Sequence, residues 1–118
     1  MRLTEVTYGS AKAIEGYGPG FFRVAGHVLR GPCLITPWDA GPWGGFDDTA
    51  APLTLVDKID VLFVGTGSQV AHVPSAFRTA LEGQGIGVEV MASPTAARTY
   101  NVLLGEGRRV AVALIPVA

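Results

Sequence analysis

The chain has 118 residues, of which 48% are hydrophobic and 16% are charged, and its formal net charge is −1. This length is typical of one domain, so we expect residues 1–118 to form a single domain around one core. The near-neutral charge and the lack of a basic run argue against nucleic acid as the main ligand.

The apolar runs and the cysteine count exclude further classes of protein. The longest apolar run, residues 110–118, is nine residues long, whereas a membrane-spanning helix needs about 20. We therefore expect no transmembrane segment. Because the N-terminus lacks an apolar signal region, the expected location is the cytoplasm. The lone Cys33 can form neither an intrachain disulfide nor a zinc site with a second cysteine, and no metal or cofactor is expected.

The first third of the chain predicts short strands. Residues 1–8 are expected to be a loose or edge segment. Two runs with β-favouring residues, 14–17 and 21–24, flank a Pro-Gly pair and predict a β-hairpin. Residues 27–29 and 33–35 predict two short strands about the turn at 30–32, or one interrupted pair.

Residues 36–52 have a different composition. They hold three prolines, three glycines, three aspartates and both tryptophans, without a strand or helix period. We expect a long loop, of the kind that is often functional or disordered, and the tryptophans argue against disorder. The next stretch, residues 53–60, fits a short helix or a strand equally well.

The second half alternates strand and helix signals. A continuous apolar run at 61–64, closed by G-T-G, and a second run at 87–91 predict strands. Between them, Pro74 and the apolar face of Phe77, Ala80 and Leu81 predict a helix that ends at Gly83 and Gly85.

A second predicted helix begins at Ser93 as N-cap, with Pro94 in its first turn. Its apolar stripe comprises Ala96, Ala97, Tyr100, Leu103 and Leu104. Residues 109–115 predict a last strand, buried on both faces. Alternating strands and helices with short connections indicate the α/β class, and this pattern alone favours a parallel sheet.

Three segments resemble a known family. They are V-L-F-V-G-T-G at 61–67, G-V-E-V-M at 87–91, and T-A-A-R-T-Y-N-V-L-L-G-E-G-R-R-V-A-V-A-L-I-P at 95–116. The family comprises largely uncharacterised bacterial and archaeal proteins, mitochondrial complex I (NADH:ubiquinone oxidoreductase) assembly factor 3 and an adipogenesis-associated human protein. The resemblance implies a three-layer α/β fold, with a central mixed sheet of about five strands, helices and a small extra β layer. It also implies that the last strand is central and antiparallel to its neighbours.

The first functional hypothesis is a non-enzymatic binding or assembly protein. The resemblance implies this role, because no enzymatic activity is established for the family and its mitochondrial member acts in respiratory complex assembly. The partner surface would combine the G-T-G loop, the start of the Ser93 helix and the tryptophan loop. Trp38 and Trp43 are the anchors expected of a protein interface, unless both rings are buried under the sheet.

The alternative is a small enzyme or a metabolite- or anion-binding protein. Small residues after a strand, followed by helix N-termini, favour contact with an anion, and the ends of strands 61–64 and 87–91 would lie at one sheet edge. The structural alternative is a tight strand exit with ordinary helix capping. The candidate ligand residues are Thr66, Gly67, Ser68, Thr95 and Arg98.

The remaining polar residues predict structural roles. Tyr100 is expected in the core with its hydroxyl bonded at the edge, and Asn101 is expected to bond the backbone of the tryptophan loop or the G-E-G turn.

His27 and His72 have no partners at metal-ligand spacing, and Cys33 fits a buried, inert thiol. Five aspartates near loops do not indicate a catalytic pair: Asp39, Asp47, Asp48, Asp57 and Asp60. Either a monomer or a homodimer is expected.

Overall fold

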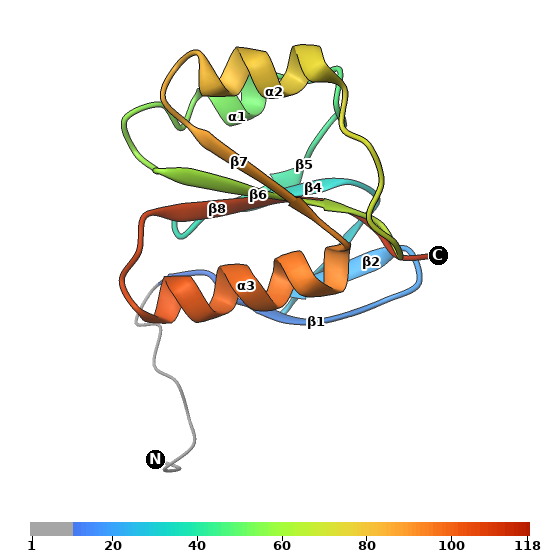
Figure 1. Cartoon of the computed structure of the whole chain (residues 1–118). Coiled ribbons are helices and arrows are strands. Elements are labelled where there is room, and N and C mark those ends of the chain that lie inside the picture. Colours follow the sequence, from blue (N-terminus) through green and yellow to red (C-terminus); the bar gives the residue numbers. More distant parts are fainter. Residues whose placement is uncertain (1–10) are drawn as a thin grey trace.

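The computed structural model describes residues 11–118, so the segment predicted at residues 1–8 lies outside the described residues. Within 11–118 the chain forms eight strands and three helices (Figure 1). The strands are β1 (Ile14–Gly18), β2 (Phe21–Val24), β3 (His27–Arg30), β4 (Cys33–Ile35), β5 (Ala40–Pro42), β6 (Val61–Thr66), β7 (Gly87–Met91) and β8 (Val110–Ile115). The helices are α1 (Ala50–Leu53), α2 (Ser75–Glu82) and α3 (Ser93–Gly105).

The strands form two sheets, and the mixed α/β class is confirmed. The larger sheet has the order β5-β4-β8-β6-β7, and the smaller one is β1-β2-β3. The predicted hairpin is present, with β1 antiparallel to β2 about a turn in which Gly20 has a φ of 81°. The strands predicted at 27–29 and 33–35 do not pair with each other. Instead, β3 joins the small sheet and β4 the large one.

Strand β8 lies in the middle of the large sheet, as expected, but its predicted direction is wrong on one side. It is antiparallel to β4 and parallel to β6. The parallel pairing follows from the helices in β6-α2-β7-α3-β8, since each helical crossover returns the chain to the same end of the sheet. Strands β6, β7 and β8 therefore run parallel, as the alternation of strands and helices predicts.

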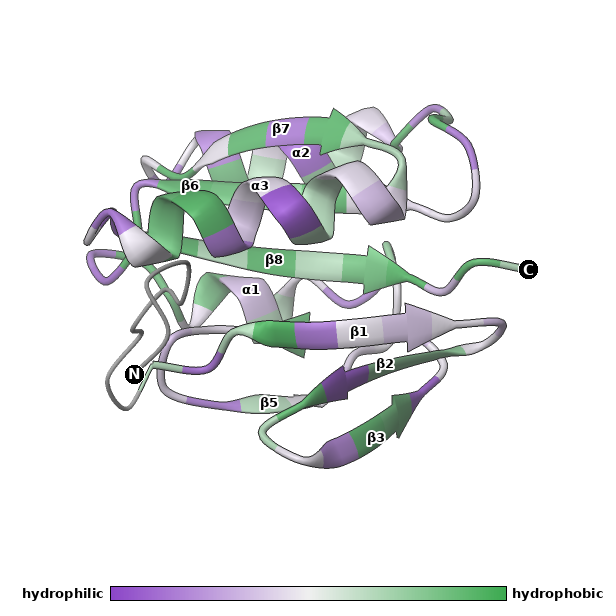
Figure 2. Cartoon of the chain, turned by 90° about the horizontal axis from the view of Figure 1, so that it is seen from below, coloured by the Kyte–Doolittle hydropathy of each residue, from purple (hydrophilic) through white to green (hydrophobic). Residues whose placement is uncertain are grey.

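Each face of the large sheet has its own core. Along β8 the side chains alternate, so that Val110, Val112 and Leu114 belong to one core and Ala111 and Ala113 to the other. Figure 1 shows α1 and α2 on one side of the sheet, and α3 with β1 and β2 on the other. Figure 2 shows hydrophobic colouring along β6 and β8 and at both ends of β7, which one hydrophilic band interrupts.

Two side chains of α3 fasten the small sheet to the body. Tyr100 is buried, and its hydroxyl donates to the Lys12 carbonyl at 2.7 Å. This confirms the prediction of a core tyrosine with a bonded hydroxyl. The Asn101 amide accepts from the Ile14 N–H and donates to the Ile14 carbonyl, both at 2.8 Å. Asn101 therefore has a structural bond to backbone, but its partner is β1 and not the tryptophan loop or the G-E-G turn.

Residues 36–52 are not one long loop, because they contain β5 and the start of α1. Strand β5 has the sequence A-G-P, which lacks β-favouring residues, and it forms because β4 offers a free edge. Proline is tolerated there since β5 is the outer strand. The ambiguous stretch 53–60 is the end of α1 followed by turns.

The helices of the described residues are short. Helix α3, the longest of them, has 13 residues. Among residues 11–118, no helix combines the length and the apolar character that crossing a membrane requires.

Candidate functional site

Trp38 is held outward by a tight turn built on Thr36. The side chain of Thr36 is buried, and its Oγ1 accepts hydrogen bonds from the N–H groups of Trp38 at 3.1 Å and Asp39 at 2.9 Å. The Thr36 N–H donates to the Asp39 carbonyl at 2.8 Å. Because these bonds fix the turn, the indole of Trp38 projects from the surface and is 57% exposed.

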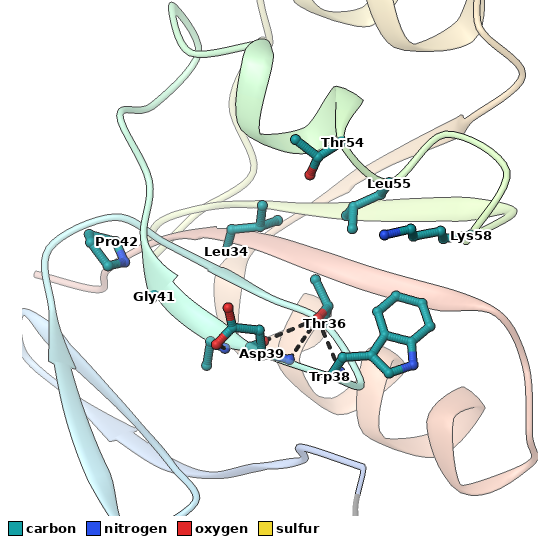
Figure 3. A pocket seen from close by; sticks show the side chains of 10 residues that line it. Leu34, Thr36, Trp38, Asp39, Gly41, Pro42, Thr54, Leu55 and Lys58 are labelled. Atoms are coloured by element: carbon teal, nitrogen blue, oxygen red, sulfur yellow. Dashed lines mark hydrogen bonds between the residues drawn. The ribbon is translucent and has the colours of Figure 1, made fainter.

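Beside Trp38 lies a hollow of about 270 Å³, between the edge of the large sheet and the turns that follow α1. Figure 3 shows Trp38 and Lys58 at one end of this hollow and Gly41 and Pro42 at the other. The lining is mixed, with an aromatic ring, a carboxylate, an ammonium group and apolar side chains. It consists of Leu34, Thr36, Trp38, Asp39, Ala40, Gly41, Pro42, Thr54, Leu55 and Lys58.

Trp43, the other predicted anchor, is only 4% exposed. Its ring packs against Phe46 and Phe77, with centroid distances of 5.5 and 5.8 Å, and its Nε1 donates to the Asp48 carbonyl at 3.0 Å. The Asp48 carboxylate in turn accepts from the N–H groups of Gly44 and Ala51. Of the two tryptophans, Trp38 is the one that offers surface to a partner.

The second predicted site lies at the ends of β6 and β7, where Ser93 fills the space. Ser93 is not the N-cap of α3, since Ala92 holds that position and makes no side-chain cap bond. The buried Ser93 Oγ accepts from the Gly67 N–H at 2.8 Å and donates to the Ile115 carbonyl at 2.5 Å. A Cβ at Gly65 would lie 2.6 Å from this Oγ, so glycine is required for Ser93 to join β6 to β8.

The other hydroxyls at this end also bond within the chain. Thr66 Oγ1 donates to the Gln69 carbonyl at 2.8 Å and accepts from the Ala71 N–H at 2.9 Å. Ser68 Oγ accepts from the Ala118 N–H at 3.0 Å. These contacts support a structural role for both residues.

Arg98 lies away from the G-T-G loop, in a groove of about 170 Å³ between α3 and β1. Glu15, Tyr17 and Pro94 also line this groove, while Thr95 is exposed on the first turn of α3. The structure thus places Arg98 beside β1 and not over the strand ends. An anion site at Thr66, Gly67, Ser68, Thr95 and Arg98 stays a prediction.

The two parts of the predicted partner surface lie at opposite ends of the sheet. Ile35, at the end of β4, pairs with Val112 near the start of β8, whereas Thr66 pairs with Ile115 at its end. The turn that carries Trp38 follows Ile35 directly. Trp38 therefore lies toward the amino end of β8, and Gly67 and Ser93 lie at the carboxyl end.

The two histidines and the lone cysteine are the remaining candidates for metal or nucleophile chemistry. His27 and His72 are exposed. Cys33 is fully buried, and burial raises the pKa of its thiol to about 12, which keeps it protonated and inert. In the part of the chain that the structure describes, no three His, Cys, Asp or Glu side chains lie close enough to hold a metal ion.

Sequence reasoning missed Thr36 and Lys58. The pattern T-P-W-D contained a signal for Thr36, since threonine hydroxyls often bond backbone groups two or three residues ahead. Lys58 carries no such signal, because only the fold brings it beside Trp38.

Comparison with known proteins supports a shared fold and a shared family. The chain is 50% identical to an uncharacterised protein of Rhodobacter capsulatus, over 98% of this chain and 94% of that one. A crystal structure described as an outer membrane protein from Bartonella henselae is 34% identical and superposes with a TM-score of 0.82, covering 92% of this chain and 98% of that one.

The chain is also similar to named mitochondrial proteins. NADH dehydrogenase (ubiquinone) 1 alpha subcomplex assembly factor 3 of mouse is 31% identical over 98% of this chain, which spans 66% of the mouse protein, about two thirds of its length. The human protein of that name is 33% identical over 98% of this chain and 67% of its own length. A family model described as "Protein of unknown function (DUF498/DUF598)" matches residues 14–115. The chain belongs to this family, which its resemblance to assembly factor 3 had indicated from sequence.

Proposed function

We propose that this chain is a non-enzymatic, cytoplasmic binding protein that assists assembly of NADH:ubiquinone oxidoreductase by holding a protein partner at the Trp38 surface. The Trp38 surface comprises Trp38, Asp39, β5 and the hollow beside them. The assembled partner would be a subunit or an assembly intermediate of that complex.

One observation carries the proposal: the similarity to assembly factor 3 extends over the whole described body. The alignments with the mouse and human proteins cover 98% of this chain, so the shared part includes both sheets and all three helices. This coverage supports the proposal that a role shared with assembly factor 3 resides in this body.

The exposed indole supports the location of the partner site. Burying a tryptophan removes roughly 200 Å² from water, yet Trp38 is 57% exposed beside a hollow. Tryptophan is enriched among the residues that dominate binding energy at interfaces, especially where they fill a pocket. A partner that covers the hollow would bury this ring.

A genetic experiment in Rhodobacter capsulatus tests the role. The gene for its 50% identical relative would be deleted, and the strain would be complemented with the present chain. We expect the deletion to lower the amount of assembled NADH:quinone oxidoreductase on native gels and the NADH-driven reduction of quinone in membranes, and the chain to restore both. Succinate-driven quinone reduction is the control and should not change. A deletion strain with wild-type levels of the assembled complex would contradict the proposal.

A further inference from the structure

The outer edge of β5 presents hydrogen-bond acceptors without matching donors. In the β4–β5 ladder Leu34 pairs with Gly41, and the bonds from Thr36 to Asp39 and from Trp43 to Pro32 continue the same alternation. The backbone groups of residues 39, 41 and 43 therefore face β4, and those of Ala40 and Pro42 face outward, because successive residues of an antiparallel strand alternate in this way.

Neither outward residue offers a free backbone donor. The Ala40 N–H donates to Asp39 Oδ1 at 2.8 Å, and Pro42 has no N–H. Within residues 11–118, no donor bonds the carbonyl oxygen of Ala40 or Pro42. A β-strand from a partner needs both donors and acceptors along an edge, so β5 is unsuited to strand addition and suited to a ligand that only donates.

The neighbouring side chains define that ligand further. Asp39 is exposed and supplies a carboxylate at the strand, and Trp38 supplies the exposed face of an indole at one end of the hollow, as Figure 3 shows. A guanidinium has five donors in a plane, accepts none, and stacks on aromatic rings. Carbonyl oxygens, a carboxylate and an indole are the groups that such a cation contacts.

We propose that the Trp38 surface binds an arginine side chain of the partner protein, with its guanidinium beside Asp39 and the outward carbonyl of Ala40, against the indole of Trp38. This inference rests on the proposed function for the existence of a protein partner. Lys58 lines the same hollow, and its positive charge opposes the bound cation. Removal of the Lys58 charge should therefore strengthen binding, and removal of the Asp39 charge should weaken it.

The test uses the isolated full chain, labelled with ¹⁵N, and the acetylated and amidated tripeptide Gly-Arg-Gly. The control peptide replaces arginine with citrulline, which has nearly the same shape and no charge, and a second control carries glutamate. We expect the arginine peptide to shift the indole N–H signal of Trp38 and the amide signal of Gly41 in a saturable manner. The Trp43 indole signal should stay in place, and citrulline should bind at least threefold more weakly.

Three variants decide whether the charges act as proposed. We expect Asp39→Asn and Trp38→Ala to weaken the arginine peptide by about three- to fivefold, and Lys58→Gln to strengthen it by about twofold, from the usual size of exposed charge and cation–π interactions. Glu89→Gln, on the opposite edge strand β7, is the matched charge control and should leave the affinity unchanged.

Equal binding of the citrulline peptide, or tighter binding of the glutamate peptide with a loss in Lys58→Gln, would overturn the arginine site. Either result would leave the genetic test of the assembly role untouched. Conversely, a deletion strain with normal respiratory complex would overturn the assembly role, while saturable arginine binding at Trp38 would still stand. The two failures are thus distinguishable.

Discussion

The two tryptophans have opposite environments, although they lie on either side of the same three-residue strand, β5. Trp43 is enclosed by Phe46 and Phe77 and bonded to Asp48, whereas Trp38 is raised from the surface by the Thr36 turn. Their exposed fractions are 4% and 57%. The difference indicates that the Trp43 ring is part of the core, whereas the Trp38 ring is available for contact with a partner.

The largest expected effect is that of Trp43→Ala. Removal of a buried tryptophan leaves a cavity and typically lowers the free energy of unfolding by about 3–5 kcal/mol. Urea denaturation, followed by circular dichroism, measures this loss. If Trp43→Ala lost less than about 1 kcal/mol, the ring would not be part of the core and the comparison of the two tryptophans would fail.

A smaller loss is expected at the closed carboxyl end of β6. Ser93→Ala removes both bonds of the Ser93 hydroxyl and leaves the N–H of the buried Gly67 without its partner, which should lower the free energy of unfolding by about 1–3 kcal/mol. Thr95→Ala, two residues further along α3 and exposed, is the matched control and should stay within about 0.5 kcal/mol. Equal effects in the two variants would show that the strand ends are open.

The buried thiol predicts alkaline sensitivity. Burial raises the pKa of Cys33 to about 12 from an ordinary value of 9.0, so its stabilising effect is complete below pH 9 and is lost as the pH rises toward 12. From this thiol, the free energy of unfolding should fall by roughly 1 kcal/mol by pH 10. Burial also raises the pKa of Tyr100, which adds to the loss at higher pH. Cys33→Ala should flatten the profile between pH 8 and 10, and an unchanged slope would contradict this account.

The smallest effect on stability is expected for Trp38→Ala. An exposed side chain that lies outside both cores contributes little, so the free energy of unfolding should change by no more than about 0.5 kcal/mol. The same denaturation series measures it beside Trp43→Ala. A loss as large as that of Trp43→Ala would mean that Trp38 is structural.

Much of the fold follows from local patterns. The apolar runs at 61–64 and 87–91, the turn at Pro19-Gly20 and the stripe of α3 each predict an element that the structure contains. Strand β5 has no such pattern, because A-G-P becomes a strand only through its pairing with β4. The family resemblance implies that β8 is antiparallel to β6, which is wrong, because the helical crossovers make the two strands parallel.

The candidate site was less predictable, since distance along the chain does not give distance in space. The sequence identifies Trp38 as a candidate anchor but treats Trp43 equally, and it does not show that Ser93 bonds Gly67 and Ile115. It also joins the tryptophan segment and the G-T-G loop into one surface, whereas the register of β4 and β8 places them at opposite ends. The surroundings of each side chain in the fold, and not its residue type, decide whether it is structural or available to a partner.

The central claim is that Trp38 serves binding and not folding, and one measurement tests it most directly. The Rhodobacter capsulatus deletion strain would be complemented with the wild-type chain, with Trp38→Ala, or with Val70→Ala, an exposed apolar residue after β6 as control. Protein levels and NADH-driven quinone reduction would be measured in each strain. We predict normal levels of all three chains, and loss of restored activity with Trp38→Ala alone. Full activity with Trp38→Ala would contradict the claim.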